Sequence, residues 1–341
     1  MPAEFYNLAW YLLVGALFTG YAILDGFDLG VGALHLLARE DEHRRVFLNA
    51  IGPFWDGNQV WLVTGGGALF AAFPHVYATA FSGFYVAFIL LLFTLIFRGV
   101  SIHVRSLRDW PRWRSFWDWA FSVSSVLASF LMGVALGNVA WGVPLEADFR
   151  YQGDLLQQLH PYTVLTGLMT VTLFAMHGAI YLVMKTEGEL QQRVQGWVRP
   201  TIIAFIIAFV MVTMATLLYL PHMAAPFRHQ PLLFAVPALA VLAIANIPRE
   251  MHRGREFQAF LSSSASMLLL LSLFGIGMFP ELIHARPDPE LSMTAYNAAS
   301  SERTLRTMLI LAGIGMPLVV GYTVHIYRVF QGKVKLDSMS Y

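Results

Sequence analysis

Residues 5–36 read FYNLAWYLLVGALFTGYAILDGFDLGVGALHL, an apolar run long enough for an α-helix to cross a bilayer. Such a helix needs about 20 apolar residues to span about 30 Å of hydrocarbon. Similar runs, separated by charged or Pro-rich connections, follow at about residues 48–72, 75–98, 116–141, 162–184, 200–220, 231–248, 257–280 and 305–330. The pattern predicts an all-α polytopic membrane protein with nine transmembrane helices, the first of them retained and not cleaved as a signal peptide.

The composition of the whole chain also indicates a lipid environment. Of its 341 residues, 57% are apolar and 13% are charged, whereas soluble proteins carry about 25% charged residues. The chain has no cysteine, which excludes disulfides and thiolate-bound metal sites, and no metal site is predicted. Its formal net charge of +1, with Lys and Arg spread along the chain, argues against nucleic acid as a partner.

The positions of the basic residues predict the orientation of the helices. Seventeen of the 22 Lys and Arg residues lie in or beside one set of alternate connections, and acidic residues collect on the opposite side. Because basic residues accumulate on the cytoplasmic side of membrane proteins, the N-terminus is predicted to be outside and the C-terminus cytoplasmic.

A faint internal repeat predicts how the helices are grouped. When the first helix is laid on the fifth, Gly15 and Gly26 match Gly167 and Gly178. The eighth predicted helix matches the fourth in the same way. The repeat predicts two four-helix bundles, residues 1–141 and 142–281, followed by a peripheral ninth helix with a cytoplasmic tail, residues 282–341.

Ionisable residues inside the predicted spans are the main candidates for function, because a charge in lipid costs several kcal/mol. Asp25 and Asp28 lie three residues apart on one face of the first helix. Asp56 would lie about eight residues into the second helix, beside Asn58 and Gln59. Carboxylates at graded depths, next to amides that hold water, are suited to pass protons. The alternative, that these acids pair with basic groups of neighbouring helices or of a partner chain, stays open.

His177 is the one histidine deep in a predicted span and is therefore the only candidate, a weak one, for a haem ligand. A satisfied structural histidine, or a contact with a bound lipid or quinone, is favoured over haem ligation. No cofactor is predicted to bind to this chain alone.

Four motifs resemble, in order and spacing, the N-terminal signature of subunit II of the cytochrome bd type quinol oxidases. They are DGFDLGVG (residues 25–32), GPFWDGNQVW (52–61), LVTGGGALFAA (62–72) and AFSGFY (80–85). The resemblance implies one subunit of a heterodimeric terminal oxidase of the bacterial cytoplasmic (inner) membrane, which oxidises quinol and reduces dioxygen to water. It implies a partner, subunit I, that binds quinol and holds two haems b and a haem d or b at the oxygen site. Small single-helix subunits are compatible with it.

The resemblance also implies roles for particular residues. In this family the first four helices of subunit II face subunit I, so residues 1–141 would be the partner-facing bundle. Asp56 would be part of a route for proton uptake from the cytoplasm, with Asp25 and Asp28 on its inner side. Trp55 and Trp61 would lie at the subunit interface or on the oxygen-access side. Subunit II would serve as a scaffold and as an access route for protons and oxygen without ligating haem.

A different class of function is a proton- or ion-coupled membrane transporter, which also uses buried acids and internal repeats. The repeat argues against it, because a unit with an even number of helices gives copies of the same orientation, whereas many such transporters use inverted copies.

The predicted orientation can be tested with introduced cysteines. Ser106→Cys and Ser338→Cys are expected to be shielded from an impermeant thiol reagent added to intact cells, because both positions would face the cytoplasm. Labelling of either cysteine from outside would show that the orientation is wrong.

Overall fold

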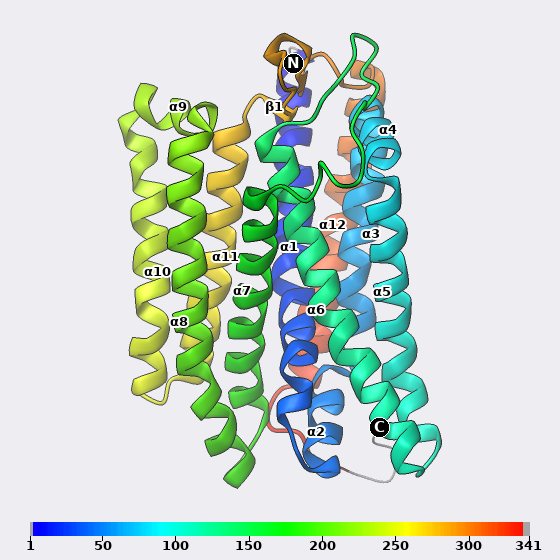
Figure 1. Cartoon of the computed structure of the whole chain (residues 1–341), viewed down its shortest axis with the longest axis vertical. Helices are drawn as coiled ribbons and strands as arrows, with labels where there is room; N and C mark the ends of the chain where they lie inside the picture. Colours follow the sequence, from blue (N-terminus) through cyan, green and yellow to red (C-terminus); the bar gives the residue numbers. More distant parts are fainter. Residues whose placement is uncertain (1–2, 337–341) are drawn as a thin grey trace.

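The computed structural model describes residues 3–336, which fold into a set of α-helices lying side by side (Figure 1). Eight helices among these residues are long and apolar enough to cross a membrane. They are α1 (Ala3–Leu34), α5 (Tyr85–Val104), α6 (Pro111–Trp141), α7 (Pro161–Lys185), α8 (Gly188–Tyr219), α10 (Ala235–His252), α11 (Glu256–Met278) and α12 (Glu302–Val329). The all-α membrane fold predicted from the sequence is therefore confirmed.

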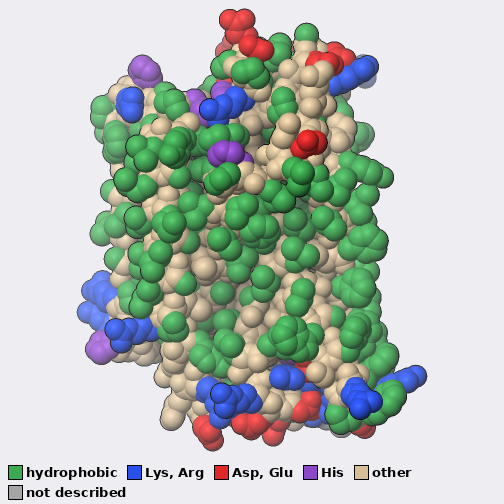
Figure 2. Space-filling view, viewed as in Figure 1, with side chains coloured by type: hydrophobic (Ala, Val, Ile, Leu, Met, Phe, Trp, Pro, Cys, Tyr) green, Lys and Arg blue, Asp and Glu red, His purple; other side chains and the backbone are tan. Residues whose placement is uncertain are grey.

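The surface of the molecule is divided into an apolar middle and two polar ends. In Figure 2, apolar side chains cover the middle of the visible face, whereas Lys, Arg, Asp and Glu gather toward its two ends. Such an apolar belt between two polar rims is what a protein surrounded by hydrocarbon exposes.

The predicted count of nine spans is not confirmed, because the second predicted span is interrupted. Residues 48–72 divide between α2 (Asp41–Ile51) and α3 (Trp55–Ala72), with a turn at residues 52–54. Polar residues and glycines keep α3 from being apolar enough to count as a span by itself, although it lies along α1 and α12. The third predicted span is also divided, at Phe84, between α4 (Pro74–Gly83) and α5.

Short elements occupy the two ends of the bundle. Helix α4, helix α9 (Pro221–His229) and the antiparallel strands β1 (Glu281–Ile283) and β2 (Met293–Thr294) lie at the end of the N-terminus, and α2 lies at the opposite end (Figure 1). Four 3₁₀ turns complete the chain: η1 (His35–Leu37), η2 (Arg105–Leu107), η3 (Pro231–Phe234) and η4 (Pro289–Leu291). The first and last described residues lie at opposite ends of the molecule (Figure 1). Ser338 lies outside the described residues.

Helix α1 is the centre of the fold, and it crosses α7 at a point where only glycine fits. A Cβ atom on Gly30 would lie 1.9 Å from the backbone oxygen of Phe174, and one on Gly178 would lie 2.4 Å from the backbone carbon of Gly30. Small residues allow such close approach in lipid, where packing contributes most of the attraction between helices. Helix α1 also contacts α3, α6, α11 and α12, so this crossing joins the two sequence halves. Their division into two four-helix bundles remains a prediction.

A methyl group at the crossing is expected to destabilise the fold. Gly30→Ala would place a Cβ atom against the backbone of α7, which cannot shift at this point without moving the rest of the helix. The change should cost about 3 kcal/mol of folding stability and lower the midpoint of thermal unfolding of the purified protein. Gly15→Ala in the same helix is the matched control, since no atom lies within 4 Å of its Cβ position. Equal midpoints for both variants would contradict the tight crossing.

Candidate functional site

A buried ion pair joins α1 to α5. The guanidinium group of Arg98 donates two hydrogen bonds to the carboxylate of Asp25, at 2.9 and 2.7 Å, and neither side chain is exposed. Two parallel bonds between a guanidinium group and a carboxylate are the strongest arrangement for such a pair. The sequence left open that an acid pairs with a basic group of a neighbouring helix, and Asp25 forms such a pair.

Asp28 is equally buried, but its partners differ. The amide nitrogen of Asn58 on α3 donates to one oxygen of Asp28, at 2.8 Å, and to the backbone oxygen of Leu24, at 3.0 Å. The hydroxyl group of Tyr327 on α12 donates to the amide oxygen of Asn58, at 3.0 Å. The second oxygen of Asp28 has no hydrogen-bond partner among the described residues. Among the described residues, Asp25 is thus paired with a guanidinium group, whereas Asp28 is bound by an amide alone.

A cavity of about 760 Å³ lies between α3 and α12, directly beside this cluster. Its lining includes Asp56, Asn58, Trp61, His103 and Tyr327. Because Asn58 lines the cavity and also binds Asp28, a single side chain stands between the cavity and that buried carboxylate. The structure therefore brings Asp25, Asp28 and Asn58 together behind one wall of the cavity and places Asp56 in the cavity itself.

Asp56 does not lie where the sequence placed it. The helix that carries it begins at Trp55, so Asp56 is in the first turn of α3 and not about eight residues into a span. Its side chain is exposed at the surface of the chain, and that of Gln59 is partly exposed. The error has a local cause: the turn at residues 52–54 ends one helix and begins another, so depth counted from residue 48 was overestimated.

The two tryptophans differ in burial. Trp55 is buried, and its ring contacts that of His103 edge to face with 5.5 Å between centroids. Trp61 lines the cavity and covers Gly20 of α1, whose added Cβ would lie 2.5 Å from the indole ring. Both rings therefore border the cavity, Trp55 from a more buried position than Trp61.

His177 is fully buried, and both of its ring nitrogens are occupied. Nδ1 lies 2.7 Å from the hydroxyl oxygen of Ser263, and Nε2 lies 3.1 Å from the backbone oxygen of Ile23. Its ring also stacks on Phe260 with 4.6 Å between centroids. Because haem iron would need one of these nitrogens, the residues present do not fit a haem at this position. No group of three or more His, Asp or Glu residues within residues 3–336 is arranged to hold a metal ion.

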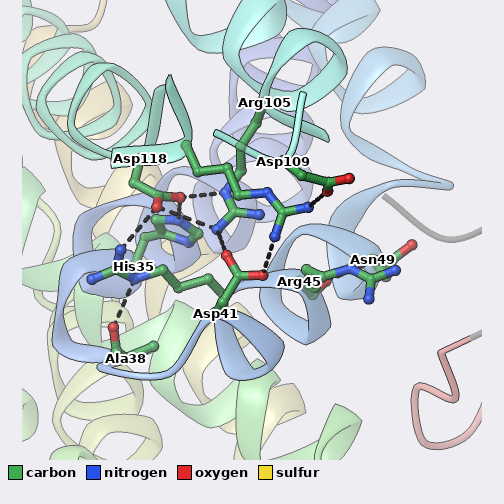
Figure 3. Close-up of polar contacts among 10 residues, drawn as sticks. His35, Ala38, Asp41, Arg45, Asn49, Arg105, Asp109 and Asp118 are labelled. Carbon is green, nitrogen blue, oxygen red and sulfur yellow. Dashed lines mark hydrogen bonds and ion pairs between the residues drawn. The ribbon is translucent and has the colours of Figure 1, made fainter. Parts of the chain in front are cut away.

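A second buried polar cluster, at the end of the molecule that holds α2, was missed from the sequence. Asp118 accepts hydrogen bonds from Arg44, at 2.8 Å, and from Arg105, at 2.5 Å, and lies 2.7 Å from His35 (Figure 3). Asp41 binds the other side of Arg105, at 2.6 Å. This cluster joins the ends of α1, α5 and α6. Asp118 falls inside the predicted span 116–141, so the rule that selected the other acids could have found it.

Comparisons with known proteins agree on one family. The family model for cytochrome bd terminal oxidase subunit II matches residues 6–330. The chain is 38% identical to cytochrome bd-I ubiquinol oxidase subunit 2 of Escherichia coli (strain K12), over 98% of this chain and 97% of that protein. It is 32% identical to cytochrome bd ubiquinol oxidase subunit 2 of Bacillus subtilis (strain 168), over 97% and 98% of the two chains. A chain in the structure of bd oxidase from Geobacillus thermodenitrificans has the same fold, with a TM-score of 0.80 at 16% identity, over 95% of this chain and 98% of that one.

Removal of one partner of the buried ion pair is expected to be costly. Arg98→Gln leaves the Asp25 carboxylate buried without a counter-charge, and the loss should be about 3–5 kcal/mol of stability. The double variant Asp25→Asn/Arg98→Gln removes both charges and should regain part of that loss. Thermal unfolding of the purified proteins measures both effects.

The control for this test is the exposed pair of Arg150 and Asp148. Arg150→Gln should change stability by less than about 1 kcal/mol, because solvent screens such a pair. A double variant no more stable than Arg98→Gln would show that charge neutralisation is not what the pair provides.

Proposed function

Because the chain belongs to the family of subunit II of cytochrome bd terminal oxidases, we propose that it carries protons from the cytoplasm toward a haem-bearing partner and binds no haem itself. The complex is a quinol oxidase, with its catalytic haems in subunit I. Family membership also decides against the alternative of an ion-coupled transporter. The observation that carries the proposal is the cavity between α3 and α12, with Asp56 in it and Asn58 leading to Asp28.

Subunit I covers the face that carries this cavity. An ionisable side chain facing hydrocarbon is costly, so the exposed Asp56 at the edge of α3 requires a protein partner or water in front of it. The neighbouring helix α12 contributes Val319, Tyr322 and Ile326 to the lining of the same cavity, so α3 and α12 present one common face. Residues of the first bundle thus face the partner together with α12.

The proton route runs through the cavity. A space of about 760 Å³ lined by one carboxylate, one amide and two phenols holds water, which can carry protons to Asp56. Asp28 lies behind Asn58 as a second acceptor, whereas Gln59 lies outside the cavity lining and is not part of this route. Asp25 is less suited to exchange protons than Asp28, because both of its oxygens bind Arg98. Uptake is from the cytoplasm, since this end of α3 lies on the side richer in basic residues.

Cofactors and further partners follow from this assignment. The two haems b, the haem d or b at the oxygen site and the quinol belong to subunit I, whereas His177 has a structural role in this chain. Trp61 and Trp55 both border the cavity and would form the wall of an oxygen-access path. Single-helix subunits and bound lipid or quinone can occupy the outer faces of the remaining helices.

The test is Asp56→Asn in the assembled complex. This change keeps the shape of the side chain and removes the titrating group, so quinol-driven oxygen consumption per haem should fall at least about tenfold if general acid–base transfer is lost. The haem content per complex should stay unchanged. Glu290→Gln, an exposed acid at the other end of the chain, is the matched control and should keep full turnover.

Two outcomes would contradict the proposal. Turnover per haem close to that of the wild type would rule out an obligatory proton role for Asp56. A loss of assembled, haem-loaded complex with normal turnover in what remains would assign Asp56 to subunit attachment instead.

A further inference from the structure

The connection between α5 and α6 holds an unusual concentration of unpaired hydrogen-bond donors. Four buried side-chain atoms without a partner fall within residues 105–117: Nη1 of Arg105, Oγ of Ser106, Nε of Arg114 and Nε1 of Trp117. Three of these atoms can only donate, and the hydroxyl group can donate as well. Buried polar atoms are rarely left without a partner, so the protein itself supplies too few acceptors in this connection.

The same connection carries an excess of positive charge. Asp41 accepts from both Arg105 and Arg114, which places those two guanidinium groups around one carboxylate. The residues of this connection and their direct ion-pair partners include five arginines but only three carboxylates. They are Arg44, Arg105, Arg108, Arg112 and Arg114 against Asp41, Asp109 and Asp118. Among the described residues no carboxylate pairs with Arg108 or Arg112, and both are exposed.

The neighbouring surface is aromatic and continues toward the membrane. Arg108 lies over the ring of Trp113, with 5.1 Å to the centroid, and Trp113 contacts Trp117 edge to face. Exposed Phe116 and Trp119 follow Arg112 along α6 at helical spacing, and exposed Val123 continues the same stripe. Basic residues above an aromatic and then aliphatic stripe match a lipid head group above its acyl chains.

The start of α6 adds backbone donors to this surface. Helix α6 begins at Pro111, and the side chain of Trp110 provides no cap for its first turn. Open N–H groups at the start of a helix bind anions, phosphate groups in particular. Side-chain donors, unneutralised charge and the helix start all require the same kind of ligand, an anionic acceptor.

We propose that the connection between α5 and α6 binds an anionic phospholipid, with Arg108 and Arg112 at its phosphate group and the stripe of Phe116, Trp119 and Val123 along its acyl chains. The proposed orientation of the chain places this lipid in the cytoplasmic leaflet. Only that placement depends on the proposed function, and binding itself is independent of proton transfer. The lipid phosphate supplies acceptors for exposed Arg108 and Arg112 and the negative charge that the protein lacks here, and the lipid fixes the depth of α5 and α6 in the membrane.

The test is a titration of the purified, delipidated complex with phosphatidylglycerol in detergent, followed by native mass spectrometry of the intact complex. Arg108→Gln/Arg112→Gln is expected to weaken binding at the tightest site about 30-fold, from the contribution of each basic residue near an anionic surface. Both residues are exposed and form no ion pair with another described residue, so the variant should keep its haem content and oxidase turnover.

The matched control removes two exposed arginines of the same half of the molecule. Arg199→Gln/Arg249→Gln should leave affinity for phosphatidylglycerol within about twofold, because neither residue adjoins the aromatic stripe. Phosphatidylcholine, which has no net charge, should bind more weakly than phosphatidylglycerol. If the control variant lost as much affinity, a loss of positive charge anywhere in this half of the molecule would explain the effect, and the proposed site would be wrong. Unchanged binding in Arg108→Gln/Arg112→Gln would overturn it as well, and competition by millimolar inorganic phosphate would assign the site to a free anion.

Discussion

The ion pair of Arg98 with Asp25 sets the arrangement of the polar interior. It lies where no bulk water reaches, so each charge depends on the other for its stabilisation, and the two helices that carry them must stay in one register. Asp28 lies one turn further along α1 and shares the same surroundings, but it receives only an amide from α3. Because the guanidinium group of Arg98 binds only Asp25, the two acids are unequal. This difference is why we propose Asp28, and not Asp25, as the acid that exchanges a proton.

Helix α1 can place both acids only because it lies so close to α7. The glycine crossing at Gly30 and Gly178 brings the backbones together, and the same helix contacts α3 and α12 on its other side. The Asn58 bridge and the Tyr327 hydroxyl group then complete a wall between Asp28 and the cavity. Packing at the crossing thus determines the geometry at the candidate site, although the glycines touch none of the site residues.

The buried acids and the exposed acid differ in where their partners lie. Asp25, Asp28 and Asp118 find their partners inside the chain. Among the described residues Asp56 has no such partner, and it is exposed beside the cavity at which we propose that subunit I binds. The α5–α6 connection is incomplete in another sense, because it has donors and positive charge but too few acceptors. In both places the unsatisfied groups of the chain indicate the chemistry of what lies next to it.

The sequence by itself determined the class of the protein and most of its membrane helices, and it selected Asp25, Asp28 and Asp56 as candidates. Length and hydropathy of a run are local properties, so α1 and α7 begin and end within a few residues of the predicted limits. The motifs from Asp25 to Tyr85 also carried the family. The tertiary structure alone decided how the acids are paired. The pairing of Arg98 with Asp25 spans 73 residues, and no periodicity in one segment specifies which distant side chain meets it. The turn at residues 52–54 places Asp56 in the first turn of α3 and not about eight residues into a span, because hydropathy averaged over a window does not show where one helix stops and another starts.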